Sequence, residues 1–233
     1  MTNFFFNAAA AVLCASATLA VAQTAPHASE VAAYAGLQAA AYRGDLAQVE
    51  KLLAAARPGR AELEARDGNG RTAVHIATFA RHRHVIAALV KAGVGLDLLD
   101  NERYDAVTIA AVANDEETLR VLLQLGASAR QVTSRYDGTA LIAAAHLGHD
   151  GVVRQLIAAG APLDHVNNLH WTAVIESIVL GDGGPKHQAV LKALIDAGAN
   201  LQLSDRQGTT PLQLAKSRRF SGMVDMLVKA GAR

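Results

Sequence analysis

One phrase recurs along the chain at nearly constant spacing, and this periodicity limits the possible folds more than any other feature. Each copy ends in a glycine, at positions 93, 126, 160, 198 and 231, so that successive intervals are 33, 34, 38 and 33 residues. A matching start precedes each glycine: Thr72-Ala73-Val74-His75, Asp105-Ala106-Val107-Thr108, Thr139-Ala140-Leu141-Ile142, Thr172-Ala173-Val174-Ile175 and Thr210-Pro211-Leu212-Gln213. A fixed period of about 20 to 50 residues is typical of arrays whose units stack on one another.

Each repeat predicts a pair of helices. The Thr or Asp at its start can cap the first helix, and the apolar residue two positions later begins a stripe that we expect to be buried. The second helix carries an apolar pair, namely Leu89-Val90, Leu122-Leu123, Leu156-Ile157, Leu194-Ile195 or Leu227-Val228. The closing glycine suits the left-handed residue that ends a helix. One such pair cannot bury its own apolar face, so neighbouring pairs must stack on it.

The repeat starts and the period resemble the ankyrin-repeat family, whose unit is about 33 residues long and carries a T-P-L-H-x-A signature. The resemblance covers residues 31–233 and implies an all-α solenoid of stacked helix-turn-helix units with β-finger loops between them. We expect about six units: a cap at 31–66 that lacks the Thr-Pro start, repeats at 67–99, 100–132, 133–166 and 167–204, and a closing unit at 205–233. In the fourth repeat, Gly181-Asp182-Gly183-Gly184-Pro185 lengthens the turn between the two helices.

The first 22 residues are expected to be a signal peptide. They contain no charged side chain, and the apolar run ends in Ala20-Val21-Ala22, a small-x-small pattern that places cleavage before Gln23. Because the segment lacks Lys and Arg, an uncleaved membrane anchor is the alternative. Cys14 is the only cysteine and leaves with the segment, which suits an oxidising compartment such as the periplasm. Residues 23–30 show no periodicity and predict a short disordered lead.

Several kinds of chemistry are disfavoured. A net charge of +1 is too balanced to attract nucleic acid. His75, His82 and His149 occupy places where ankyrin repeats carry structural histidines, and no H-E-x-x-H is present, so we expect no metal and no cofactor. Catalytic nucleophile motifs are also missing. The chain is therefore expected not to be an enzyme, with a small hydrolase using Glu176 and neighbouring histidines such as His170 as the less favoured alternative.

The finger loops are the expected binding surface. In ankyrin proteins, residues just before the capping Thr project on the concave side and commonly contact partners, and Tyr, Trp and Arg are frequent in binding hot spots. The resemblance maps this role onto Arg71, Glu102, Tyr104, Arg135, Tyr136, Leu169, Trp171, Arg206 and Gln207. For Trp171, packing back on the adjacent finger stays open beside partner contact. Arg103, Asp137 and His170 stand where the finger glycine belongs and are expected to strain or reshape those turns.

A narrower resemblance concerns the fourth repeat. Its Leu169-His170-Trp171-Thr172-Ala173, the glycine-rich turn and His187 are similar to exported ankyrin proteins of Gram-negative bacteria. This implies a periplasmic, non-catalytic adaptor or inhibitor that grips a globular protein, either in peroxide defence with a catalase or in protection from a cell-wall hydrolase. We expect a monomer that binds neither nucleic acid nor, after cleavage, a membrane. The alternative is a membrane-tethered scaffold.

Overall fold

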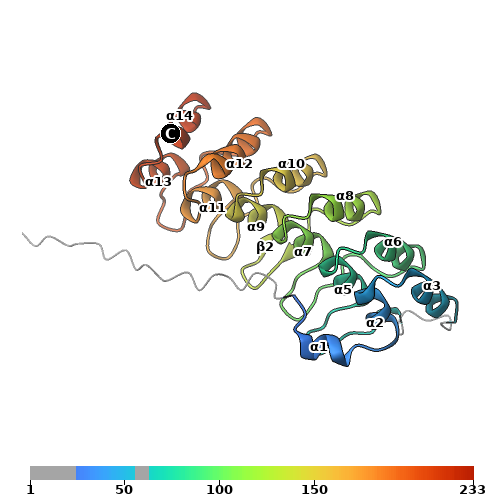
Figure 1. Ribbon diagram of the computed structural model, residues 1–233. Coiled ribbons are helices and arrows are strands. Elements are labelled where there is room, and N and C mark those ends of the chain that lie inside the picture. Colours follow the sequence, from blue (N-terminus) through green and yellow to red (C-terminus); the bar gives the residue numbers. More distant parts are fainter. Residues whose placement is uncertain (1–24, 56–62) are drawn as a thin grey trace, which may run out of the picture.

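The computed structural model describes residues 25–55 and 63–233, so the predicted signal peptide and part of the connection after the cap lie outside the described residues. The helices form two parallel rows (Figure 1). The inner row contains α2 (Gly36–Arg43), α5 (Ala73–Phe79), α7 (Ala106–Val112), α9 (Ala140–Leu147), α11 (Ala173–Val179) and α13 (Pro211–Ser217). The outer row contains α3 (Leu46–Ala55), α6 (Arg83–Lys91), α8 (Glu116–Gln124), α10 (Asp150–Ala158), α12 (Pro185–Asp196) and α14 (Ser221–Lys229).

The two rows give the predicted all-α ankyrin solenoid of about six stacked helix pairs. Each inner helix contacts the next inner helix, each outer helix contacts the next outer helix, and the two helices of a unit contact each other. Among the described residues, the buried side chains form one continuous cluster from Ala40 to Ala232, so the units share a single core. This is the arrangement expected when apolar faces are buried only by stacking.

The predicted caps and buried stripes are present. The Asp105 side chain accepts a 2.7 Å hydrogen bond from the Thr108 amide, and Thr172 accepts one of 3.3 Å from the Ile175 amide. In the second helices the first member of each apolar pair is fully buried, as in Leu89 and Leu227, whereas its neighbour is less buried and Val228 is 55% exposed. The sequence pattern therefore identified the core-facing side of both helices.

The fingers are closed turns that contact one another along the stack. They span residues 67–71, 100–104, 134–138, 167–171 and 205–209, and four of them begin with Asp or Asn, whose side chain accepts the amides two and four residues later. Backbone hydrogen bonds of 2.9 Å join the first four in sequence, for example from the Asn101 amide to the Asn69 carbonyl. Beside the third finger, β1 (Val132–Thr133) pairs antiparallel with β2 (Gly138–Thr139), with Val132 opposite Thr139.

The fingers without glycine keep the left-handed turn. Arg103, Asp137 and His170 have φ of 64°, 51° and 64°, close to the 73° and 78° of Gly70 and Gly208. These three residues therefore adopt a conformation that costs L-residues about 1–2 kcal/mol. The outcome is local strain at three turns, while the finger geometry recurs along the stack.

The predicted disordered lead at 23–30 is wrong for its last residues. Helix α1 spans Ala28–Ala33, and the Glu30 carboxylate accepts a 2.9 Å hydrogen bond from the His27 amide at its start. The helix also packs on the first finger, described below. The sequence lacks periodicity here because a helix of six residues is too short to display it, and its stability comes from tertiary contacts.

The glycine-rich turn of the fourth repeat is ordered by its own polar contacts. Pro185 is the first residue of α12, as expected from its fixed φ. The Asp182 carboxylate lies 2.8 Å from Nδ1 of His187, and Nε2 of His187 lies 2.9 Å from the His146 carbonyl oxygen. The backbone amide of Gly184 also donates to Asp182 and holds the pKa of that exposed carboxyl below its usual value, with His187 contributing. The long turn is thus attached to the inner helix of the preceding repeat.

Candidate functional site

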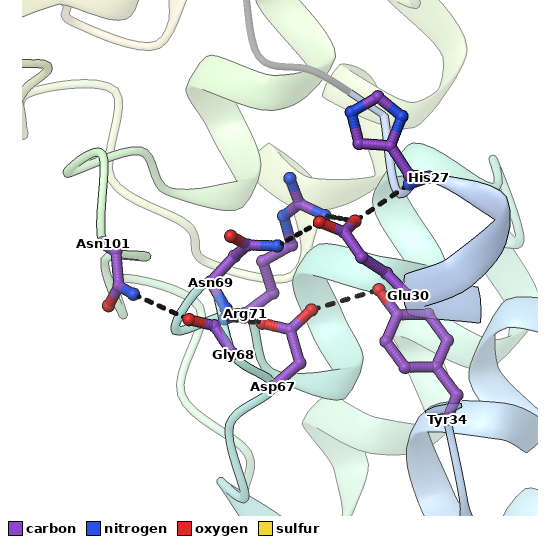
Figure 2. Close-up of polar contacts among 8 residues, drawn as sticks. All are labelled: His27, Glu30, Tyr34, Asp67, Gly68, Asn69, Arg71 and Asn101. Atoms are coloured by element: carbon purple, nitrogen blue, oxygen red, sulfur yellow. Dashed lines mark hydrogen bonds and ion pairs between the residues drawn. The ribbon is translucent and has the colours of Figure 1, made fainter. Parts of the chain in front are cut away.

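The finger face is defined here as the surface formed by the five fingers and the inner-row helices. At its N-terminal end, Arg71 is covered rather than exposed (Figure 2). Its guanidinium forms a 3.1 Å ion pair with Glu30 of α1, and the Arg71 side chain is only 8% exposed. The Asn69 side chain donates a 2.7 Å hydrogen bond to the same carboxylate. The structure therefore places Arg71, expected to contact a partner, in the attachment of α1 to the first finger.

Further contacts strengthen this attachment. The Tyr34 hydroxyl donates a 3.1 Å hydrogen bond to the Asp67 carboxylate, and burial raises the pKa of Tyr34 to about 12. The hydrogen bond from the His27 amide is the main cause that lowers the pKa of Glu30, and the hydrogen bond from the Asn69 side chain lowers it further. The Arg71 guanidinium also lies 5.1 Å from the centre of the Phe79 ring, within cation–π range. Helix α1 thus closes the N-terminal end of the finger face.

The other predicted charged and polar residues lie exposed along the finger tips. Arg135 forms an ion pair with Glu102 of the preceding finger, and both side chains are more than half exposed. Arg206 reaches back to donate a 2.8 Å hydrogen bond to the Asn168 carbonyl, while Gln207 is exposed at the last tip. Leu169 lies at the fourth tip and is 39% exposed. These residues form a continuous rim from the second finger to the fifth.

The structure brings two of the three predicted aromatic residues to one pocket. Tyr104 and Tyr136 line a cavity of about 430 Å³ on the finger face. Tyr136 is 39% exposed, whereas Tyr104 is half-buried and burial raises the pKa of its hydroxyl. Trp171 is half-buried and does not line this cavity. Its side chain therefore does not contribute to the pocket that the two tyrosines share.

The pocket is built from three consecutive repeats. Its walls combine fingers with the inner helices α7 and α9, and its lining is mostly apolar. The full set of lining residues is Tyr104, Thr108, Val112, Thr133, Ser134, Tyr136, Gly138, Thr139, Ile142, Ala143, His146, Leu147, Asn167 and Glu176. The volume falls within the range of about 300–1,000 Å³ that is usual for ligand sites.

Glu176 is the buried acidic group of the pocket. Its side chain is 6% exposed; Oε1 accepts a 3.0 Å hydrogen bond from the Asn167 amide, while Oε2 has no hydrogen-bond partner among the described residues. Burial raises the pKa of Glu176 to about 7, partly offset by the Asn167 hydrogen bond. Such a carboxyl with one unused oxygen is expensive to bury and often marks a functional site.

The histidine beside Glu176 is His146, not the expected His170. Nδ1 of His146 lies 3.9 Å from Oε2 of Glu176, too far for a hydrogen bond. Burial, with His187 nearby, lowers the pKa of His146 and favours its neutral form. His170 is exposed in its finger. The long turn of the fourth repeat is held by Asp182 and His187 rather than by Glu176.

The structural histidines hold backbone groups as expected. His75 lies with Nδ1 2.8 Å from the Thr72 hydroxyl oxygen and Nε2 2.9 Å from the Leu98 carbonyl oxygen. His82 and His149 each contact a carbonyl oxygen of the preceding unit, at Tyr42 and Ala111. Within residues 25–55 and 63–233, no group of three His, Cys, Asp or Glu side chains is arranged to hold a metal ion.

The expected binding surface contains neither Glu176 nor Asn167, although the repeat carries a signal for both. Glu176 occupies the helix position that is Ile76, Ile109, Ala143 and Leu214 in the other repeats, so it is a charged residue at an apolar place. Asn167 occupies the finger position that is Asp67, Asp100 and Asp205 elsewhere. An aligned comparison of the repeats identifies both.

Together, the finger turns, the two helix rows and the continuous core define an ankyrin-repeat protein. A family model described as "Ankyrin repeats (3 copies)" matches residues 37–133 and 141–233, and the chain belongs to this family. It is 32% identical over 194 residues to the putative ankyrin repeat protein YahD of Escherichia coli K12, covering 83% of this chain and 94% of that protein.

Solved structures agree. An ankyrin repeat domain from Acinetobacter baumannii (ABAYE2397) is 39% identical with a TM-score of 0.78, covering 84% of this chain and 98% of that one. The ankyrin domain of Bcl-3 is 26% identical with a TM-score of 0.77, covering 86% and 88%. These three relatives are described as ankyrin proteins, and none of them as an enzyme.

The described helices are all short. Within the part of the chain that the structure describes, none combines the length and the apolar character that crossing a bilayer requires.

Proposed function

We propose that this chain is a non-catalytic protein-binding module that grips a globular partner through its finger face. The main support is the convergence of Tyr104 and Tyr136 on one mostly apolar pocket, beside the exposed Leu169 and the charged rim. Buried aromatic anchors surrounded by polar residues are the usual anatomy of a binding hot spot. Ankyrin repeats generally bind proteins, and nothing in the pocket requires a reaction.

We further propose that the module acts in the periplasm after removal of residues 1–22. The uncharged apolar run and Ala20-Val21-Ala22 support export, and a mature chain without cysteine suits that compartment. N-terminal sequencing of the protein from cells tests this proposal. A terminus at Gln23 agrees with it, whereas an intact Met1 favours the membrane-tethered scaffold.

Affinity capture from a periplasmic extract tests the binding function. Residues 23–233 serve as bait beside Tyr136→Ala, Trp171→Ala and the control Val228→Ala, which removes an exposed apolar side chain from α14. We expect a specific partner with the wild type and the control, and loss of that partner with Tyr136→Ala. A catalase or a cell-wall hydrolase is the partner class to look for first. Identical capture by all four baits contradicts the proposal.

A further inference from the structure

Glu176 Oε2 is the feature of the finger face that the proposed function leaves unexplained. A carboxylate oxygen that is buried without a partner costs more than a satisfied one, and replacing Glu176 by Ile, as at the equivalent position 109, would remove this cost. The equivalent residue on α9 is the small Ala143, which also lines the cavity. Because Ala143 is small, it leaves open space in the cavity, and the unpaired Oε2 of Glu176 lies at the wall of this space.

The surroundings of this oxygen favour a cationic occupant. The groups near the carboxyl are the Asn167 amide, already bonded to Oε1, and His146, whose lowered pKa favours the neutral ring. At the rim, the Arg135 guanidinium is paired with Glu102. No cation therefore neutralises Glu176 from the described residues that line the pocket.

The walls set a second requirement. They are lined by Val112, Ile142 and Leu147, with the two tyrosines at the finger side. A small hydrated ion gains nothing from such walls, whereas a side chain with an apolar stem and a charged end buries the stem and extends the charge to the carboxylate. Aromatic rings beside the path add cation–π attraction.

We propose that this pocket receives a lysine or arginine side chain of the protein partner, with its charged end hydrogen-bonded to Glu176. The inference rests on the proposed protein-binding function and adds the chemistry by which the partner is recognised. Its occupant supplies the one partner that Oε2 lacks.

Peptide titrations monitored by NMR test this inference on the purified protein near neutral pH. The probes are acetylated, amidated Gly-Gly-X-Gly-Gly peptides in which X is lysine, arginine or norleucine; norleucine keeps the stem and removes the charge. We expect the lysine or the arginine peptide to bind at least about tenfold more tightly than the norleucine peptide. Equal binding of all three peptides overturns the proposal.

Two variants and one control locate the binding. Glu176→Gln keeps the size of the side chain and is expected to reduce binding of the cationic peptide to the norleucine level. Glu117→Gln, an exposed carboxylate on the outer helix α8, is the matched control and should bind like the wild type. Unchanged binding by Glu176→Gln overturns the proposal. If this variant does not fold, Ala143→Leu decides: it fills the cavity without altering Glu176, and binding that survives it contradicts the site.

A titration with the free amine butylamine distinguishes a protein side chain from a small-molecule cation as the occupant. Butylamine binding more tightly than the lysine peptide assigns the pocket to a small amine and overturns the proposal for a protein side chain. The same variants also distinguish a wrong cation site from a wrong protein-binding function. A partner captured equally by Glu176→Gln and the wild type, but lost by Tyr136→Ala, leaves the binding module intact and contradicts only the cation site.

Discussion

The side-chain amide of Asn167 donates a 3.0 Å hydrogen bond to Oε1 of Glu176, and this bond joins the fourth finger to the pocket. Oδ1 of the same Asn167 accepts the amides of Leu169 and Trp171. One buried side chain thus shapes the finger that carries two predicted contact residues and positions the acid of the pocket. The shape of the fourth finger and the position of the Glu176 carboxyl therefore both depend on Asn167.

Replacing Asn167 is expected to be costlier than replacing its counterpart in the last finger. Asn167→Ala leaves two partly buried amides and the buried Oε1 of Glu176 without their partner, which we expect to lower the free energy of unfolding by about 2–3 kcal/mol. Asp205→Ala removes the same turn contacts in the more exposed fifth finger and should cost about 1 kcal/mol. Urea unfolding measures both, and equal losses would show that the link to Glu176 contributes nothing.

The burial of Glu176 predicts a pH-dependent stability. The pKa of Glu176 is about 7 in the fold against a usual value of 4.5, because burial favours the protonated side chain. The contribution of Glu176 to the free energy of unfolding is therefore fully present below pH 4.5 and is lost as the pH rises through about 7. Glu176→Gln should therefore match the wild type at about pH 4 and exceed it by as much as about 3 kcal/mol at about pH 8. Urea unfolding at both pH values checks this. The buried Asp105, whose pKa is also raised by burial, to about 6, is present in both proteins and cancels in the comparison. Parallel pH profiles would contradict the prediction.

The attachment of α1 predicts a local effect at the N-terminal end. Arg71→Met keeps the apolar part of the side chain and removes the ion pair with Glu30, which should cost about 1–3 kcal/mol of local stability. Hydrogen exchange in Ala28–Ala33 is expected to accelerate, while the amides of α9 stay protected. Arg206→Met, which removes an exposed arginine from the last finger, is the control and should leave α1 unchanged. If Arg71→Met instead abolishes partner capture with α1 still protected, Arg71 acts directly in binding.

The close contact between the first two fingers predicts a difference between two glycines. A Cβ at Gly70 would lie 2.9 Å from the Asn101 backbone nitrogen, whereas no atom of the described residues lies within 4 Å of a Cβ at Gly208. Both residues have positive φ, so alanine at either site costs about 1–2 kcal/mol in backbone conformation. Gly70→Ala should cost clearly more than Gly208→Ala in thermal melting, because backbone must also move. Equal losses would mean that the first two fingers separate without penalty.

Much of the architecture is predictable from the sequence because the fold is a repeat. Caps such as Thr172 and buried residues such as Leu122 recur at fixed positions, and recurrence reveals their role without any knowledge of their neighbours. The helix α1 is different: its stability depends on a pairing between Glu30 and Arg71, 41 residues apart, which no local pattern contains. For the same reason the sequence does not show that Arg71 is covered.

The candidate site is only partly predictable. Tyr104 and Tyr136 are recognisable as unusual finger residues, but the pocket between them depends on how three units stack. Glu176 and Ala143 occupy equivalent positions in neighbouring repeats, and only their side-by-side placement on α11 and α9 creates the space. Sequence periodicity gives the register of such positions, while the cavity itself is a property of the packed array.

The construction of the pocket from three units also affects how the array comes apart. A linear stack unfolds by losing units from its ends, and each loss breaks a single interface. An occupant that contacts the second, third and fourth repeats spans two of these interfaces and stabilises only the stacked form. A partner bound in this pocket would therefore clamp the middle of the molecule and confine fraying to the cap, the first repeat and the closing unit.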